Sequence, residues 1–368
     1  MVRSIDKISI AGFKSIRLLE NFELSKLNIL IGANGVGKSN FVTFFSFLHE
    51  LLNQHLALTV NKGGGADAHL FLGPKVTTQI SAALVFGPNG YSFVLDPTVD
   101  NRLVFKDERI QFWGDMKTID RSIGTGHSES SLTQQLRDPQ NSRIANYIND
   151  AISSWILYHF HDTSENAPMR RLSSVRDCER LRKDGANLAA MLLKWKQEEP
   201  AVYEVIRDTV KLVAPFFDDF LLRPKDVSGD SLVQLEWKQQ HSDYPLHAGQ
   251  FSDGTLRFIA LATALLQPSP PATILIDEPE LGLHPFALNI LTGLIASASQ
   301  HTQIIISTQS PGLLNAFQPE DIIVTDRKDG ASTFQRLSAS DLGTWINEEY
   351  TLGELWQKSV YGGGPTHE

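Results

Sequence analysis

The sequence predicts an α/β fold that combines a mixed N-terminal antiparallel sheet, a parallel core sheet and an inserted, mostly helical lobe. Three observations lead to this class. A glycine-rich loop, Gly32–Ser39, lies between an apolar strand and a helix. Strands alternate with helices over residues 252–325, which is typical of a parallel sheet. Between these two parts, apolar residues recur at helical spacing.

The glycine-rich loop has the sequence GANGVGKS and matches the pattern of a phosphate-binding loop. Leu27–Ile31 before it predicts a buried strand, and the residues after it predict a helix. Glycines let the backbone turn tightly and approach a ligand, while the loop N–H groups and the helix N-terminus point at an anion. A glycine turn that binds nothing is the alternative, and the surrounding strand and helix argue against it.

Two side chains complete this predicted nucleotide site. Lys38 can reach the β- and γ-phosphates, and the Ser39 hydroxyl can hold Mg²⁺. The predicted nucleotide contacts are Gly32, Asn34, Gly35, Gly37, Lys38, Ser39 and Asn40.

Length and composition limit the class of protein. The 368 residues exceed one typical domain, and 42% hydrophobic with 20% charged residues suit a soluble globular protein. The single cysteine, Cys178, excludes an internal disulfide and is consistent with a reducing compartment, so we expect a cytoplasmic protein. Neither a membrane span nor a secretory signal pattern is expected. The net charge of −9 leaves any nucleic-acid binding to a local patch.

Residues 1–114 are expected to form the first part of the main domain. The helix after the phosphate loop should end near Leu52, and residues 61–67 predict a flexible connector. Turn residues at 87–90 are a hairpin signal within an antiparallel meander. The predicted strands of this part are 5–16, 22–31, 77–86, 91–95, 103–105 and 109–113.

Residues 115–240 are expected to form the inserted lobe. Their first stretch, 115–141, is rich in Ser, Gly and Gln and predicts a mobile loop. From Ser142 a helix is expected, because isoleucines recur at i+4 spacing, at Ile144, Ile148, Ile152 and Ile156. Residues 156–160 are a candidate strand. Further helices are predicted at 187–196 and 201–213, and a further strand at 232–238.

Residues 241–368 are expected to complete the main domain. Helices are predicted from Ser252 to Leu266 and over 285–298, and apolar strands at 272–276, 303–307 and 321–325. Ligands of a parallel sheet lie beyond the carboxyl ends of its strands. We therefore expect Gly32, Asp277 and Gln309, which all follow strands, to meet at one site.

Two adjacent acids, Asp277 and Glu278, follow the strand at 272–276. A strand-end aspartate can hold the Mg²⁺ that Ser39 also contacts. The next carboxylate can orient or deprotonate an attacking water. An ordinary turn with two surface acids is the alternative, but in a chain with a phosphate-binding loop we favour the catalytic interpretation.

Three motifs stand in the order found in ABC-type ATPases: GANGVGKS, FSDGTLR at Phe251–Arg257 and ILIDEPELGLHP at Ile274–Pro285. Gly12–Ile16, with the sequence GFKSI, is also typical of the RecF/SMC-like branch. The chain resembles that branch and the AAA-family ATPases with short insertions, among them the OLD-like ATPases. The likeness covers roughly residues 1–112 and 251–325. It implies a P-loop ABC-type ATPase head that binds ATP and Mg²⁺.

The resemblance also implies a second copy of the chain as a partner. Ser252 and Gly254 belong to the signature loop, which in this family faces the γ-phosphate held by another subunit. Two subunits would then sandwich two ATP molecules head to tail. ATP would join the subunits and hydrolysis would release them.

The sequence departs from the family pattern in two places. Gln309 stands where a switch histidine is common; it can donate a hydrogen bond to a γ-phosphate oxygen but cannot take a proton. A loop amide without a catalytic role is the alternative. His284 occupies a position that is Asp in transporter-type members. No residue is assigned as the Q-loop glutamine, for which Gln79 is a candidate.

Two further groups of residues have less specific patterns. His159, His161 and Asp162 lie in YHFHD, where a polar strand end is favoured over a metal site. A basic cluster is interleaved with acids, so a solvated helix face is favoured over a contact with a phosphate backbone. This cluster comprises Arg170, Arg171, Arg176, Arg180, Arg182 and Lys183.

The sequence leaves two biological roles open for the ATPase. The first is a nucleotide-gated dimer that controls a separately encoded effector, as in bacterial anti-phage modules. The second is a clamp on DNA in repair or chromosome maintenance. An ATPase subunit of a membrane transporter is a third and weaker alternative, because the FSDGT signature resembles the chromosome-associated branch more closely.

Overall fold

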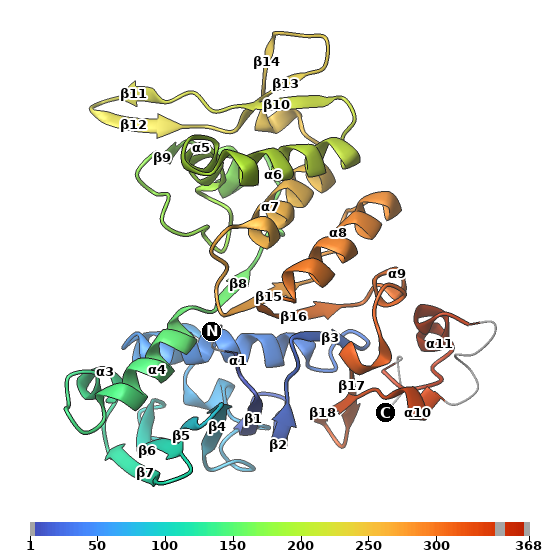
Figure 1. The fold of residues 1–368 in the computed structure, drawn as a ribbon. Helices are drawn as coiled ribbons and strands as arrows, with labels where there is room; N and C mark the ends of the chain where they lie inside the picture. Colours follow the sequence, from blue (N-terminus) through green and yellow to red (C-terminus); the bar gives the residue numbers. More distant parts are fainter. Residues whose placement is uncertain (1–3, 343–349, 364–368) are drawn as a thin grey trace.

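The computed structural model describes residues 4–342 and 350–363. A six-stranded sheet lies at its centre, and all neighbouring strands are parallel except the last pair, β17 and β18 (Figure 1). The strands across this sheet are β18 (Ala331–Arg336), β17 (Ile322–Lys328), β3 (Leu27–Ile31), β16 (Gln303–Thr308), β15 (Thr273–Asp277) and β8 (Ile156–Tyr158).

Both faces of the parallel sheet are buried, in two different cores. In β3, Ile29 and Ile31 join the core on one face, whereas Leu30 joins the core on the other face. Leu275 of β15 and Ile305 of β16 also lie on the second face, between neighbours that lie on the first. Successive side chains of a strand point to opposite faces, so a sheet covered on both sides needs uninterrupted apolar strands. This explains the apolar runs in the sequence.

The second large sheet is antiparallel and follows the chain almost in order. Its strands are β2 (Ile16–Glu23), β1 (Lys7–Phe13), β4 (Ile80–Phe86), β5 (Asn89–Pro97), β6 (Leu103–Trp113) and β7 (Thr118–Gly124). The predicted hairpin at 87–90 joins β4 to β5, which pair from Phe86↔Asn89 to Ile80↔Leu95. The predicted N-terminal meander is therefore confirmed.

The segment 115–141 is not a mobile loop as predicted, because it contains β7 and a short helix. β7 is an edge strand whose side chains are exposed or half-buried, so no apolar alternation marks it in the sequence. The rest of the segment is held by Glu108, which is fully buried. Its carboxylate accepts hydrogen bonds from Ser130 Oγ at 2.5 Å and from Ser131 N at 2.7 Å.

Helices fill the space between the two large sheets. The fourth of them, α4, buries Ile144, Ile148 and Ile152 as predicted, whereas Ile156 lies beyond its end in β8. The predicted connector at 61–67 is in part helical. The helices on this side are α1 (Lys38–Leu52), α2 (Leu56–Lys62), η1 (Ala66–Ala68), α3 (Leu132–Gln135) and α4 (Ser142–Ser153).

The other face of the parallel sheet is covered by helices that rise into the lobe (Figure 1). The predicted helices at 187–196, 201–213, 252–266 and 285–298 are confirmed to within a few residues. The helices and 3₁₀ turns beyond α4 are η2 (Pro168–Arg170), α5 (Leu188–Glu198), α6 (Pro200–Val213), η3 (Ala248–Gln250), α7 (Asp253–Leu266), α8 (Pro285–Ala298), α9 (Pro311–Leu314), η4 (Pro319–Asp321), α10 (Ala339–Leu342) and α11 (Leu352–Gln357).

Two small antiparallel sheets cap the lobe. One is formed by β10 (Phe217–Leu221), β13 (Glu236–Gln239) and β14 (Pro245–His247), and the other by β11 (Lys225–Val227), β12 (Asp230–Val233) and β9 (Ser173–Ser174). The single strand predicted at 232–238 is wrong, because the chain passes there from one sheet to the other.

The three-part division at residues 114 and 240 stays a prediction. Of the middle part, β7 and β8 lie in the two large sheets rather than in the lobe. Among the residues described, no helix has the length and apolar character needed to cross a bilayer.

Candidate nucleotide-binding site

Four neighbouring parallel strands end at the same edge of the central sheet. The glycine-rich loop follows β3, Gln309 follows β16, Asp277 ends β15, and His161 lies shortly after β8. The structure therefore confirms the expected meeting of Gly32, Asp277 and Gln309 at one edge. The proximity of β8 was not predicted.

The glycines of the loop meet different structural demands. Gly35 and Gly37 have φ angles of 81° and 110°, in the left-handed region that favours glycine. A Cβ at Gly37 would collide with the hydroxyls of Ser15 and Ser332, and a Cβ at Gly32 would collide with the backbone of Thr325. By contrast, open space surrounds the Cβ position of Gly35, which lies with Asn34 on the exposed side of the loop.

Lys38, the first residue of α1, folds back over the loop. Its Nζ donates hydrogen bonds to the carbonyl oxygens of Gly32 at 2.7 Å and Ala33 at 3.0 Å. Burial lowers the pKa of Lys38, and the nearby carboxylates, chiefly those of Glu278 and Asp277, oppose this shift. The ammonium is thus held at the loop beside a group of acids.

A set of hydroxyl and amide contacts holds the loop from behind. Asn40 Nδ2 donates to Ser15 Oγ at 2.7 Å. Ser332 Oγ donates to the Val36 carbonyl at 2.6 Å and lies 2.7 Å from Ser15 Oγ. The predicted nucleotide contact Asn40 therefore binds the Gly12–Ile16 turn, while Ser39 beside it is exposed at the N-terminus of α1.

The two predicted acids have unusual surroundings. Asp277 Oδ1 is buried and has no hydrogen-bond partner among the described residues. Glu278 has a φ of 45°, which a non-glycine residue rarely adopts, and such strain concentrates at functional sites. The backbone N–H of Glu278 donates to the Ser307 carbonyl at 2.8 Å, and its Oε1 accepts from Gln309 Nε2 at 2.6 Å.

Glu280 is a third carboxylate at this edge, and the sequence analysis missed it. Its Oε1 accepts hydrogen bonds from Thr308 Oγ1 at 2.6 Å and from Gln309 N at 3.0 Å. Burial raises the pKa of Glu280, and these two hydrogen bonds oppose the shift. Glu280 fixes the backbone of the residue whose side chain contacts Glu278. The sequence signal that could have identified Glu280 is the presence of a second acid two residues after Glu278.

The predicted signature loop begins α7. Ser252 is exposed at the N-cap, and its Oγ accepts from Thr255 N at 3.1 Å. Gly254 packs directly against the backbone of Gly282, where a Cβ would collide with the carbonyl oxygen. Gly282 belongs to the turn that follows Asp277 and Glu278, so α7 contacts that turn.

Arg257 extends this contact to β8. The side chain is buried, and Nε donates to the Phe160 carbonyl at 2.9 Å while Nη2 donates to the His161 carbonyl at 3.0 Å. Nη1 donates to the carbonyl of Leu281. One guanidinium therefore joins the signature helix to the segments after β8 and β15. Arg257 is the last residue of the FSDGTLR motif, and no role was predicted for it from the sequence.

His161 lies shortly after β8, at the same edge of the central sheet as Asp277. Its Nε2 donates to the Asp277 carbonyl at 2.8 Å. Gln79, the predicted candidate, instead precedes β4 in the antiparallel sheet, where its side chain lies 3.4 Å from Lys106 Nζ. The structure does not bring Gln79 to the strand ends. The predicted departure His284 caps α8, its Nδ1 accepting from Phe286 N at 3.2 Å.

The basic cluster is not a helix face, because only the 3₁₀ turn η2 is helical within residues 168–183. Arg170 is buried and donates to the Thr163 carbonyl at 3.0 Å and to Asp253 Oδ1 at 3.0 Å. It thus holds the start of α7. The other cations of the cluster are exposed: Arg171, Arg176, Arg180, Arg182 and Lys183.

The residues at the strand ends fit a nucleotide with Mg²⁺. The loop offers N–H groups and a lysine for phosphate, and the unpartnered Asp277 Oδ1 offers a ligand atom to a cation. The described residues, this site included, contain no group of three or more His, Cys, Asp or Glu placed to hold a metal ion.

Comparison with known families agrees with this geometry. A family model described as "AAA domain, putative AbiEii toxin, Type IV TA system" matches residues 27–315, which include the phosphate loop, the signature loop and both acids. No curated protein matches the chain significantly.

Solved SMC head domains share the fold. An SMC head bound to the C-winged helix domain of ScpA is 17% identical, with a TM-score of 0.58 over 91% of this chain and 98% of that chain. An SMC head from Pyrococcus furiosus, bound to the C-terminal domain of ScpA, is 16% identical, with a TM-score of 0.56 over 94% and 98%. One from Pyrococcus yayanosii is 13% identical, with a TM-score of 0.53 over 91% and 97%. These matches confirm the predicted P-loop head of the ABC and SMC type.

Proposed function

Because the chain belongs to the AbiEii-type family of AAA-domain ATPases, we propose that it hydrolyses ATP with Mg²⁺ and uses the reaction as a molecular switch. The observation that carries this proposal is the meeting of the phosphate loop, Asp277, Glu278 and Gln309 at the ends of neighbouring strands. Phosphate-binding and acidic groups at one sheet edge are the parts that phosphoryl transfer to water requires.

Each side chain has a defined task in this proposal. When ATP binds, Lys38 releases the two loop carbonyls to which it donates in this structure and donates to phosphate oxygens instead. Ser39 and Asp277 would hold Mg²⁺, which would supply charge neutralisation at the phosphate oxygens. Glu278 accepts the proton of the attacking water. Gln309 orients the Glu278 carboxylate through the 2.6 Å hydrogen bond from its Nε2.

The switch itself is a head-to-tail dimer of two copies. Ser252 and Gly254 would face the nucleotide of the second copy with the positive end of α7. Two large apolar side chains, Leu281 and Phe286, are exposed by 47% and 52% in the turn against which Gly254 packs and at the start of α8. Exposed apolar groups beside an exposed signature loop support a surface that another subunit covers when ATP is bound.

We further propose that the dimer controls a separately encoded effector, in bacterial anti-phage defence. The family description supports this role, because it refers to a toxin–antitoxin system. One structural neighbour is bound to the winged-helix domain of another protein, which supports a protein partner for this head as well.

A DNA clamp is the second candidate function. The exposed cations between Arg171 and Lys183 favour it, although Arg170 is engaged with Asp253. A clamp that uses these cations should lose affinity steeply as salt is added. Duplex binding that is absent in the presence of ATP, or insensitive to salt, would eliminate this candidate.

Steady-state ATP hydrolysis, with and without duplex DNA, tests both candidates. We expect Glu278→Gln to lower kcat by about a hundredfold or more while ATP still binds, because the proton acceptor is lost and the phosphate loop is kept. Glu198→Gln, an exposed change on α5, is the matched control. Full activity of Glu278→Gln would refute the assignment. Stimulation by DNA would favour the clamp, and DNA-independent turnover the effector switch.

Dimer formation is measured separately from ATP hydrolysis. Light scattering of Glu278→Gln with ATP should show twice the mass that is seen without nucleotide, and Ser252→Arg should abolish that increase. A mass that does not respond to ATP would refute the switch and leave the hydrolysis assignment standing.

A further inference from the structure

A cavity of about 420 Å³ lies between α1 and β8 and takes no part in the ATPase switch proposed above. It is bounded by one side of α1, the start of β8 and the loop at 180–184. Its volume lies within the range of small-molecule sites. The residues that matter in it are His49, Trp155, His159, Arg180, Arg182 and Lys183.

Two of the cations in this cavity have no carboxylate partner among the described residues. Arg180 donates only to the Ser153 carbonyl, at 3.2 Å, and Lys183 makes neither an ion pair nor a side-chain hydrogen bond there. The third cation, Arg182, pairs with Asp177 at 2.7 Å. The lining acids have partners too: Glu50 contacts His55, and Asp184 accepts from Ala186 N.

The pKa values of the two histidines in the cavity reflect the positive charges around them. Burial lowers the pKa of His49, and the charges of Lys183 and Arg180 lower it further against the opposing effect of Glu50. Burial also lowers the pKa of His159, with His161 and Lys183 adding to the shift and Asp277 opposing it. Cations that disfavour the charged form of their neighbours favour an anion in the same place.

Trp155 supplies a second, independent observation. Only 4% of its surface is exposed, and its indole N–H is buried without an acceptor among the described residues. Buried tryptophan N–H groups usually have a partner, and an unpaired one costs free energy. The N–H itself has almost no accessible surface, so an acceptor atom of a ligand would reach it only after the ring shifts.

We propose that this cavity binds a small molecule that carries a phosphate group. Phosphate has several acceptor oxygens and two negative charges, and it matches an arginine, a lysine and N–H donors better than a single carboxylate does. The cations line a recess that also contains Trp155, Ile156 and Leu181, which suits a compact ligand rather than the backbone of a duplex.

The cavity is connected to the nucleotide site through β8. The backbone N–H of His159 donates to the Lys183 carbonyl at 2.8 Å, and β8 pairs with β15 up to Tyr158↔Ile276. Beyond β8, His161 contacts the carbonyl of Asp277. A ligand on Lys183 would therefore fix the segment that touches the proposed Mg²⁺ ligand. A regulatory effect on hydrolysis follows, and this part rests on the proposed ATPase function.

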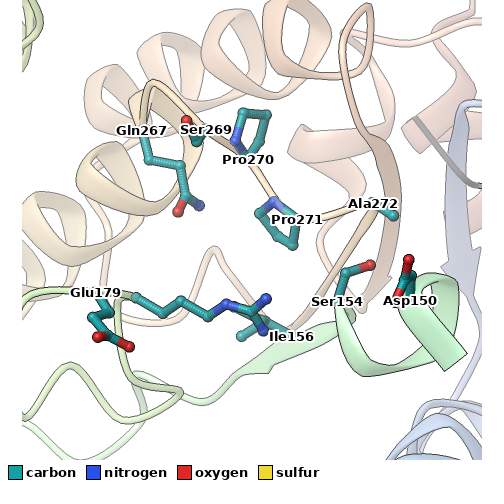
Figure 2. A pocket seen from close by; sticks show the side chains of 10 residues that line it. Asp150, Ser154, Ile156, Glu179, Gln267, Ser269, Pro270, Pro271 and Ala272 are labelled. Atoms are coloured by element: carbon teal, nitrogen blue, oxygen red, sulfur yellow. The ribbon is translucent and has the colours of Figure 1, made fainter. Parts of the chain in front are cut away.

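A neighbouring cavity of about 430 Å³ shares Arg180 and Ile156 with the first. Figure 2 shows it between Pro270 and Pro271 on one side and Glu179 on the other. The part of a ligand that does not carry the phosphate has room there, because Arg180 lines both cavities.

Calorimetric titration of pyrophosphate, run beside acetate, tests the binding site. The titrations use protein that carries Lys38→Ala, so that the phosphate loop does not compete. We expect one site, weakened about tenfold when Lys183→Ala or Arg180→Ala is added. Adding Lys62→Ala, an exposed change on α2, should leave the affinity unchanged.

Three outcomes would overturn the binding site. They are no heat with pyrophosphate, equal affinity for acetate, and unchanged affinity in both cation variants. Melting temperatures of the variants show that each is folded. If duplex DNA binds through Lys183 and pyrophosphate does not bind, the cations belong to a DNA surface and the proposal fails.

The regulatory part has a separate measurement. Pyrophosphate competes with ATP at the phosphate loop and so raises KM, whereas its effect through the cavity should change kcat. Lys183→Ala should remove the kcat effect and leave the KM effect. If kcat of the wild type does not respond, regulation is refuted while the binding site stands. Loss of all hydrolysis in wild type would instead refute the proposed ATPase.

Discussion

Replacing Glu280 by alanine tests whether the segment after β16 must be held for hydrolysis. The change removes the acceptor of two hydrogen bonds, from Thr308 Oγ1 at 2.6 Å and from Gln309 N at 3.0 Å. A hydrogen bond to a charged group contributes about 1.5–3 kcal/mol, and partial exposure of Glu280 favours the lower end. The pair therefore stabilises the position of Gln309 by roughly 2–3 kcal/mol.

This free energy should appear mainly in kcat. Gln309 donates to Glu278, so a displaced Gln309 leaves that carboxylate without its 2.6 Å partner. Since about 1.4 kcal/mol corresponds to a tenfold change in rate, we expect Glu280→Ala to lower kcat by roughly thirty- to a hundredfold. KM for ATP should change by less than about twofold, because neither hydrogen bond of Glu280 goes to the phosphate loop.

The assay is steady-state ATP hydrolysis over a range of ATP concentrations. Glu280→Gln keeps an oxygen acceptor and should stay within about threefold of the wild type. Glu198→Ala on α5 controls for the loss of a surface carboxylate. An unchanged kcat in Glu280→Ala, or a rise in KM alone, would show that Glu280 does not act through Gln309 and Glu278.

Three further changes test contacts elsewhere. Gly254→Ala should lower the free energy of unfolding by about 1–3 kcal/mol, because the added Cβ meets the Gly282 carbonyl. Gly249→Ala, with open space around its Cβ position, is the control in thermal unfolding. Equal melting temperatures of the two variants would contradict this account. Arg257→Met should cost about 2–5 kcal/mol in urea unfolding, since the backbone carbonyls that it holds lose their donors; a loss below 1 kcal/mol would contradict it. Burial lowers the pKa of His69 from its usual 6.5. The neutral side chain therefore contributes its full stabilisation above pH 6.5, and this contribution is lost as the pH falls through the lowered pKa. Wild-type melting temperature should therefore fall more steeply than that of His69→Gln below about pH 6.5, and parallel curves would refute this.

Local patterns were enough to predict the phosphate loop and the elements around it. The loop has a glycine pattern, β15 and β16 each have three consecutive apolar residues at their centre, and α7 begins at a serine N-cap. Such signals depend on neighbours in the chain, so one sequence reveals them. The meeting of Asp277 and Gln309 could also be predicted, because strand ends of a parallel sheet share an edge.

Other parts of the site depend on contacts between distant residues, which no local pattern encodes. Arg257 holds carbonyls near residue 160, and a basic side chain in a helix gives no hint of that. His161 reaches the site only because β8 pairs with β15. Arg170 looked like part of a solvated cluster, yet its partner Asp253 lies far along the chain. β7 lacked an apolar face and therefore looked like a loop.

The place of β3 in the central sheet has a consequence for synthesis of the protein. This strand is completed by Ile31, but its two neighbours are β16, beginning at Gln303, and β17, beginning at Ile322. At about 5–20 residues per second, a ribosome needs roughly 15–60 s to make the intervening chain. Throughout that interval the backbone groups of this five-residue strand, four of whose side chains are apolar, have no sheet partners. The nascent chain thus carries an apolar strand without its sheet neighbours for most of translation. The nucleotide site that β3 supports forms only near the end of translation.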